Sequence, residues 1–184
     1  MEAKKVRNRR GYLDNYVKGM DGRYIYTGEY MKFLGTAVAK RAMDVQIIVT
    51  ASLVFVLLVA SSFTLAGDMS RSIYVVIPYV LEVIIGFFLI WYTYKFEHGG
   101  NPMKKYIYDK VAGKLPVFGI FTTIAAGLGA VLSVVFMLVN KPEQTMLTLG
   151  IIYAVIKAAQ AVVGIFFSAA FRKGKWELER GNLA

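Results

Sequence analysis

The stretch that decides the fold is LPVFGIFTTIAAGLGAVLSVVFMLV, residues Leu115 to Val139, which contains no charged side chain. At about 1.5 Å per residue of helix, it is longer than the roughly 30 Å hydrocarbon layer of a bilayer. A backbone inside lipid has to satisfy its own hydrogen bonds, and a helix does this within one segment. The stretch therefore predicts a transmembrane α-helix.

Three more stretches have the same character, and one of them is also free of charge. The chain of 184 residues is 57% hydrophobic with a mean hydropathy of +0.50, which is too apolar for an ordinary soluble domain. We therefore predict an all-α integral membrane protein with four transmembrane helices. Their expected bounds are Val45–Ala66, Ser72–Tyr94, Leu115–Val139 and Met146–Phe171.

The connections indicate how these helices pair. Gly67–Arg71 joins the first two spans and Asn140–Thr145 joins the last two, and both loops are short turns with Gly or Pro as breakers. The middle connection, Lys95–Lys114, is longer and contains the turn sequence HGGNP. We expect two tight hairpins in a compact bundle.

Basic residues are unevenly placed between the two sides of this bundle. Every Lys and Arg lies before the first span, in the middle connection or after the last span, except Arg71, Lys141 and Lys157. The positive-inside bias then predicts that both termini and the middle connection are cytoplasmic, in a multi-pass cell membrane protein. Short loops fit a bacterial plasma membrane. The net charge of +10 is read as a topology signal and an attraction to anionic lipids, and we expect no nucleic-acid partner.

The chain divides into three parts: a basic leader at residues 1–44, the transmembrane domain at 45–171, and a tail at 172–184. The first dozen residues suggest a flexible basic tail. Around Thr27 and Gly28, alternating tyrosines are compatible with a small hairpin. From Glu29 onward the apolar residues fall at helical spacing, which predicts an amphipathic helix lying in the membrane interface.

Two ionisable residues lie deep inside the spans, Glu82 in the second and Lys157 in the fourth. Both spans enter the membrane from the same side, and both residues come at a similar distance from the start of their span. They are expected at nearly the same depth, where a charge without a partner is costly. The sequence therefore predicts that Glu82 and Lys157 face inward and form an ion pair.

Small residues around these charges predict close helix packing, because little hydrophobic force drives helices together in lipid. Gly86 lies one turn after Glu82 on the same face, and Gln160 lies one turn after Lys157 on a neighbouring face, where it could hydrogen-bond to the pair or to a second subunit. A stripe of small residues flanks Lys157: Gly150, Ala154, Ala161 and Gly164. Such stripes also make a homo-oligomer or a partner helix plausible.

The activity is less constrained than the fold. No nucleotide-binding, zinc-protease, hydrolase or thiol motif occurs, and the chain has no Cys and a single His, His98. We expect no enzyme activity, no cofactor and no metal. Two functions remain open: an accessory or assembly subunit of a membrane complex, in which the pair only fixes helix register, or a small ion or solute transporter that uses Glu82 and Lys157 as a relay.

Overall fold

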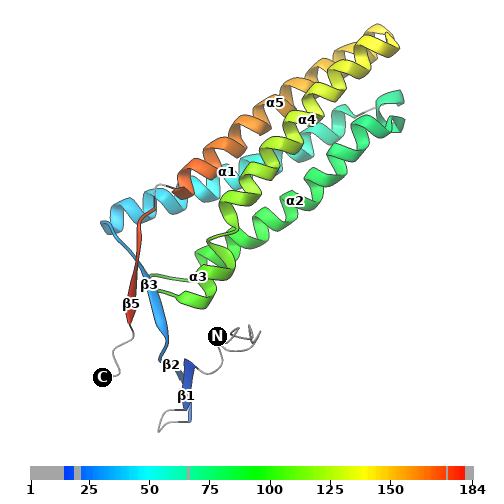
Figure 1. Cartoon of the computed structure of the whole chain (residues 1–184). Coiled ribbons are helices and arrows are strands. Elements are labelled where there is room, and N and C mark those ends of the chain that lie inside the picture. Colours follow the sequence, from blue (N-terminus) through cyan, green and yellow to red (C-terminus); the bar gives the residue numbers. More distant parts are fainter. Residues whose placement is uncertain (1–14, 19–21, 66, 173, 181–184) are drawn as a thin grey trace, which may run out of the picture.

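The computed structural model describes residues 15–18, 22–65, 67–172 and 174–180. It contains four long helices: α1 (Ala37–Thr64), α2 (Ile73–Glu97), α4 (Leu115–Asn140) and α5 (Gln144–Arg172), which run side by side in one bundle (Figure 1). Each of them is long and apolar enough to cross a membrane. The prediction of four helices of spanning length and apolar composition is thereby confirmed, and these features suggest a membrane protein.

The order of the helices around the bundle determines which residues can meet inside it. α4 packs most extensively against α5, α5 packs against α1, and α4 packs against α2. α1 and α2 close the ring with a smaller contact. α2 and α5 are therefore diagonal to each other, separated by α1 on one side and α4 on the other.

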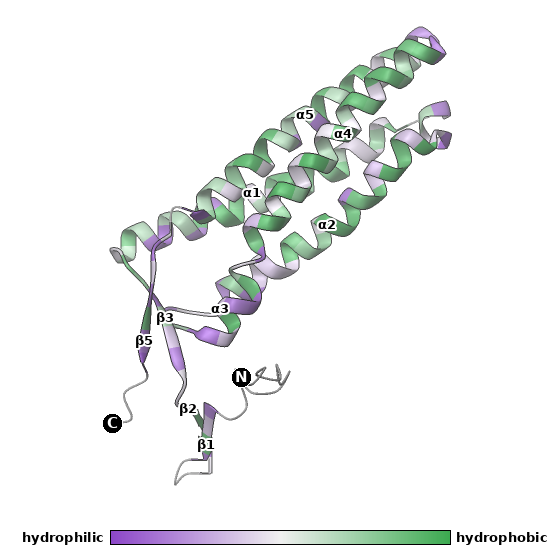
Figure 2. Ribbon diagram, in the orientation of Figure 1, coloured by the Kyte–Doolittle hydropathy of each residue, from purple (hydrophilic) through white to green (hydrophobic). Residues whose placement is uncertain are grey.

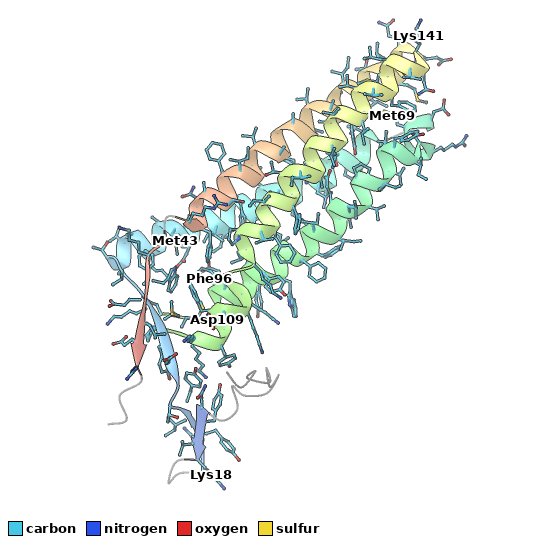
Figure 3. All side chains as sticks on the ribbon, viewed as in Figure 1. Lys18, Met43, Met69, Phe96, Asp109 and Lys141 are labelled. Carbon is cyan, nitrogen blue, oxygen red and sulfur yellow. The ribbon has the colours of Figure 1, made fainter. Side chains whose placement is uncertain are left out.

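The connections at one end of the bundle are as short as predicted. A single 3-10 turn, η2 (Gly67–Arg71), leads from α1 to α2, and three residues, 141–143, lead from α4 to α5. Lys141 takes a left-handed conformation with φ 44°, which ends α4 and turns the chain back. Met69 of η2 and Lys141 mark this end of the bundle in Figure 3. It is called the loop end below.

The leader differs from the prediction, and the interfacial amphipathic helix is wrong. Residues Glu29–Phe33 form a strand, β3, and α1 begins only at Ala37, where the Thr36 side chain accepts a hydrogen bond from the Ala39 N–H. Tyr30 and Phe33 are three residues apart, so they would share one side of a helix but lie on opposite faces of β3. Partners from distant parts of the chain decide between the two conformations, as the register of β3 shows.

β3 is the central strand of a small antiparallel sheet with the order β4-β3-β5. β4 (Met103–Lys104) comes from the middle connection, and β5 (Trp176–Arg180) comes from the tail. Met31 lies opposite Met103 on one side and opposite Leu178 on the other. The sheet therefore holds the leader, the middle connection and the tail together at one end of the bundle (Figure 1). It is called the sheet end below.

The hairpin expected around Thr27 and Gly28 is replaced by a different pairing. β2 (Tyr24–Tyr26) pairs with β1 (Tyr16–Lys18), which comes earlier in the chain, and does not pair with β3. The Tyr16 hydroxyl lies 3.1 Å from the hydroxyl of Tyr106 on the short helix α3 (Lys105–Val111). These contacts dock the two-stranded unit on the middle connection. The basic tail expected over the first dozen residues lies outside the described residues.

An ion pair adds to the attachment of the leader. Lys105 of α3 donates to the carboxylate of Glu29 at the start of β3. This hydrogen bond lowers the pKa of the Glu29 carboxyl from its ordinary value. The contact therefore operates at neutral pH and is lost only as acid protonates Glu29.

Aromatic residues form the junction between the sheet and the helices. The indole of Trp176 lies 5.5 Å from the ring of Phe33, 5.9 Å from Phe96 and 5.2 Å from Tyr108, measured between ring centroids. The buried residues beneath this junction include Met43 and Phe96, which come from α1 and α2 (Figure 3). One apolar core therefore continues from the bundle into the sheet.

We predict that Trp176→Ala lowers the free energy of unfolding in mild detergent by about 2 kcal/mol, less than full burial of a Trp would cost. Trp176→Phe should retain most of the stability, because the buried indole N–H has no hydrogen-bond partner in the described part of the chain. Trp91→Ala is the control, since Trp91 is 55% exposed on the outer face of α2. Equal losses for Trp176→Ala and Trp91→Ala would contradict the junction.

The contact between α4 and α5 depends on two glycines. A Cβ on Gly164 would lie 2.6 Å from Oγ1 of Thr123 and 3.0 Å from the carbonyl oxygen of Gly119. Thr123 also donates to the carbonyl of Ala161, at 3.2 Å. The two backbones therefore approach too closely at this point for a side chain.

We predict that Gly164→Ala destabilises the bundle by about 1–3 kcal/mol, because the new methyl group has to push the backbone of α4 away. Gly127→Ala on α4 is the matched control, because a Cβ at Gly127 meets nothing within 4 Å. That variant should be neutral or stabilised by up to about 1 kcal/mol, from helix propensity alone. Thermal unfolding in detergent distinguishes the two. A neutral Gly164→Ala would show that the crossing is looser than described.

Candidate functional site

The strongest candidate site is the predicted ion pair, which the structure contains. Nζ of Lys157 lies 2.5 Å from Oε2 of Glu82, and both side chains are completely shielded from the surface. The same ammonium donates to Oε1 of Gln160 at 3.3 Å. All three predicted polar residues therefore meet in one place.

The pair joins two helices that are not neighbours. Glu82 belongs to α2 and Lys157 to α5, which are diagonal in the bundle, so the two side chains meet in its interior. A salt bridge between adjacent helices could form at their edge, beside the lipid. A diagonal one has to cross the centre, where it is surrounded by protein on every side.

Along the bundle, the pair lies between two buried apolar clusters. Seven residues before Glu82, Val75 belongs to the buried apolar cluster of the loop end, and seven residues after it, Leu89 belongs to the cluster of the sheet end. On α5, Tyr153 and Phe167 flank Lys157 in the same way. The charges are therefore enclosed between two apolar layers.

Three further residues complete the site, and their role was not predicted from the sequence. Nζ of Lys157 lies 5.0 Å from the ring centroid of Tyr79 and 5.3 Å from that of Tyr153. A Cβ on Gly129 of α4 would lie 3.2 Å from Oε1 of Glu82. Tyr79 and Tyr153 each come about one turn before a charged residue, and this spacing is the signal that could have identified them.

Two polar atoms of the site remain without a partner. Oε1 of Glu82 and the hydroxyl of Tyr153 are buried and accept or donate no hydrogen bond among the described residues. A buried polar atom without a partner costs about 1–3 kcal/mol. The site is therefore buried and its two charges neutralise each other, but two of its polar atoms make no hydrogen bond in the described part of the chain.

The small residues have partners other than those their positions suggested. Gly86 lies on the same face of α2 as Glu82, but a Cβ there would contact Leu58 of α1, at 3.1 Å. Gly150 lies against Met137 of α4, and Gly164 lies against Gly119 of the same helix. Ala154 and Ala161 are half-buried beside them.

The stripe on α5 is thus largely covered by α4 of the same chain. Two of its glycines are buried there, and they need no second molecule to fill the space above them. The stripe alone therefore no longer argues for a homo-oligomer.

A second, partly buried group of titratable residues lies at the sheet end: Nζ of Lys40 lies 2.5 Å from Oδ1 of Asp44, and Oε1 of Glu97 is buried without a hydrogen-bond partner among the described residues. Nδ1 of His98 lies 2.9 Å from the carbonyl oxygen of Tyr94, at the exposed end of α2. Among the described residues, no group of three or more His, Cys, Asp or Glu side chains is placed to hold a metal ion.

Fold and site together define a class: a membrane protein whose four-helix bundle encloses a diagonal Glu–Lys pair and carries a small sheet at one end. Comparison with known proteins adds nothing to this class, because no family model, no curated protein and no solved structure matches the chain.

We predict that Glu82→Gln and Lys157→Met, made singly, each lower the free energy of unfolding by about 3–5 kcal/mol, because each leaves one buried charge without its partner. The double variant should recover most of this loss, since it buries no charge. The matched control is Glu143→Gln with Lys141→Met, which alters the same residue types at exposed positions of the loop end. Additive losses in the double variant, measured by thermal unfolding in detergent, would show that the pair is not coupled.

Proposed function

We propose that this chain is a non-enzymatic accessory or assembly subunit of a membrane complex, and that the ion pair is an internal clamp. The single observation that supports this role most directly is the complete enclosure of Glu82 and Lys157, which bind each other in the bundle interior. A carrier needs an ionisable group that exchanges with water or substrate on both sides of the membrane.

The energetics favour a clamp. Removing a charge from water costs several kcal/mol per ion. The attraction between the two ions offsets this cost only when their geometry is good and both stay in place. Here the pair is 2.5 Å apart and bounded by apolar clusters toward both ends. Opening it would separate two charges in a medium of low dielectric constant. The arrangement favours one fixed register of α2 and α5.

The sheet end supplies the surface through which such a subunit would contact its partner. It joins the leader, the middle connection and the tail, and Figure 2 shows hydrophilic residues there beside the apolar helices. By the positive-inside bias we place this end and both termini in the cytoplasm, in a cell membrane that contains anionic lipids, most consistent with a bacterial plasma membrane. The partner is a membrane protein or a second copy of the chain.

A second function has its own supporting observation. Oε1 of Glu82 and the hydroxyl of Tyr153 are buried without hydrogen-bond partners. Unsatisfied polar atoms beside an intramembrane charge are where a small ion, a proton or a small solute would bind during transport. A small ion or solute transporter that uses the Glu82–Lys157 pair is therefore the alternative.

Proteoliposomes test the choice between the two functions. We predict that wild type and the double variant Glu82→Gln/Lys157→Met show the same proton and alkali-cation leak as empty liposomes under an imposed pH gradient or potential. A flux that is present in wild type and absent in the double variant would establish the transporter instead.

Cross-linking tests the subunit role directly. A photoreactive amino acid at Leu178, which is 44% exposed on β5, should cross-link to a partner chain in intact membranes. The same residue at Val155, 63% exposed on α5, is the control and should contact lipid. A chain that runs as a single 20.5 kDa protomer in mild detergent and gives no protein cross-link at Leu178 would contradict the role.

A further inference from the structure

A long groove runs between α2 and α4 on the surface that faces lipid. Its apolar part has a volume of about 780 Å³, and its lining contributes almost no polar surface. The walls are formed by Ile77 and Leu81 of α2 and by Phe121, Ile124 and Leu128 of α4. Pro78 and Ala125, which are buried residues with short side chains, also line it.

Toward the loop end the groove continues into a second space of about 730 Å³, which is called the mouth below. Tyr74 and Leu132 line both parts, so the two spaces adjoin. Both volumes fall in the range of about 300–1,000 Å³ that is usual for small-molecule sites. The apolar part of the groove between α2 and α4 is called the trunk below. The mouth differs from the trunk because its lining includes the polar residues Asp68, Arg71 and Asn140.

The two charged residues of the mouth are available to a ligand. Asp68 and Arg71 both lie on the short turn η2, and both are exposed. Neither forms an ion pair with another residue in the described part of the chain. One carboxylate and one guanidinium, three positions apart on η2, therefore line the polar end of an apolar groove.

An apolar groove that ends in one carboxylate and one guanidinium matches an amphiphile whose headgroup carries one positive and one negative charge. We propose that the groove binds a phospholipid with an ethanolamine headgroup, with its acyl chains along α2 and α4. Arg71 contacts the phosphate, for which a guanidinium is well shaped, and Asp68 contacts the primary ammonium.

The position of the mouth agrees with this occupant. η2 directly precedes α2, so its charges lie where a spanning helix leaves the apolar layer, at headgroup level. Tyr74 at the boundary between trunk and mouth is the residue type enriched at that level. An anionic lipid would place its surplus charge beside Asp68, which makes a headgroup without an ammonium the poorer fit.

Retention of defined lipids on the purified protein, measured by native mass spectrometry, tests the proposal. Wild type should retain phosphatidylethanolamine about tenfold better than phosphatidylcholine or phosphatidylglycerol, the size of one charge-assisted hydrogen bond. Arg71→Gln should lower the retention of all three lipids, because each has a phosphate, and should keep the preference for ethanolamine, which depends on Asp68. Asp68→Asn should abolish the preference for ethanolamine and keep the remaining binding.

Matched controls separate the groove from ordinary lipid contact. Lys141→Gln and Glu143→Gln change the other basic and acidic residue of the loop end, which do not line the mouth, and should have no effect. Ile124→Trp fills the trunk and should displace the lipid, whereas Ile165→Trp, on an equally exposed face of α5, should not. Equal retention of the three lipids by wild type, or equal losses for Arg71→Gln and Lys141→Gln, would overturn the proposal.

Discussion

The structure depends on the contact between Glu82 and Lys157. Exposing either charge to lipid would cost free energy, so α2 and α5 have to direct Glu82 and Lys157 toward the interior, at the same level along the bundle. Because the two helices are diagonal, this requirement also fixes α4, whose Gly129 lies beside the carboxylate. Three of the four helices are thus oriented by one interaction, and α1 completes the ring around it.

The helices and the pair could be predicted because each span, and the one charged residue inside it, can be recognised from a single continuous stretch of sequence. Hydropathy over a fixed length identifies a spanning helix, and two lone charges at equal depth identify each other. The partners of the small residues could not be predicted in the same way. Gly86 indicates that some backbone or side chain comes close, but its spacing from Glu82 does not show that the neighbour is Leu58 of α1.

The sheet could not be predicted, for a physical reason visible at β3. Glu29–Phe33 is short enough to fit a helical face and a strand alike, and its own propensity does not decide between them. The decision comes from Met103 and Leu178, which lie far along the chain and pair with Met31 on opposite sides. Trp176 then fixes the sheet to the bundle. Strands of two to five residues that pair over such distances leave almost no local pattern.

The closed interior and the open surface groove suggest how this molecule meets its surroundings. Its deepest charges neutralise each other and are enclosed by apolar layers, which leaves little free charge in the centre for a passing solute. The exposed charges of Asp68 and Arg71 lie at the loop end of the bundle, where they line the polar mouth of the groove between α2 and α4. Recognition is therefore expected along the flank and at the sheet end. A rigid centre serves such recognition, because it holds α2 and α4 at a constant separation and so keeps the groove between them in one shape.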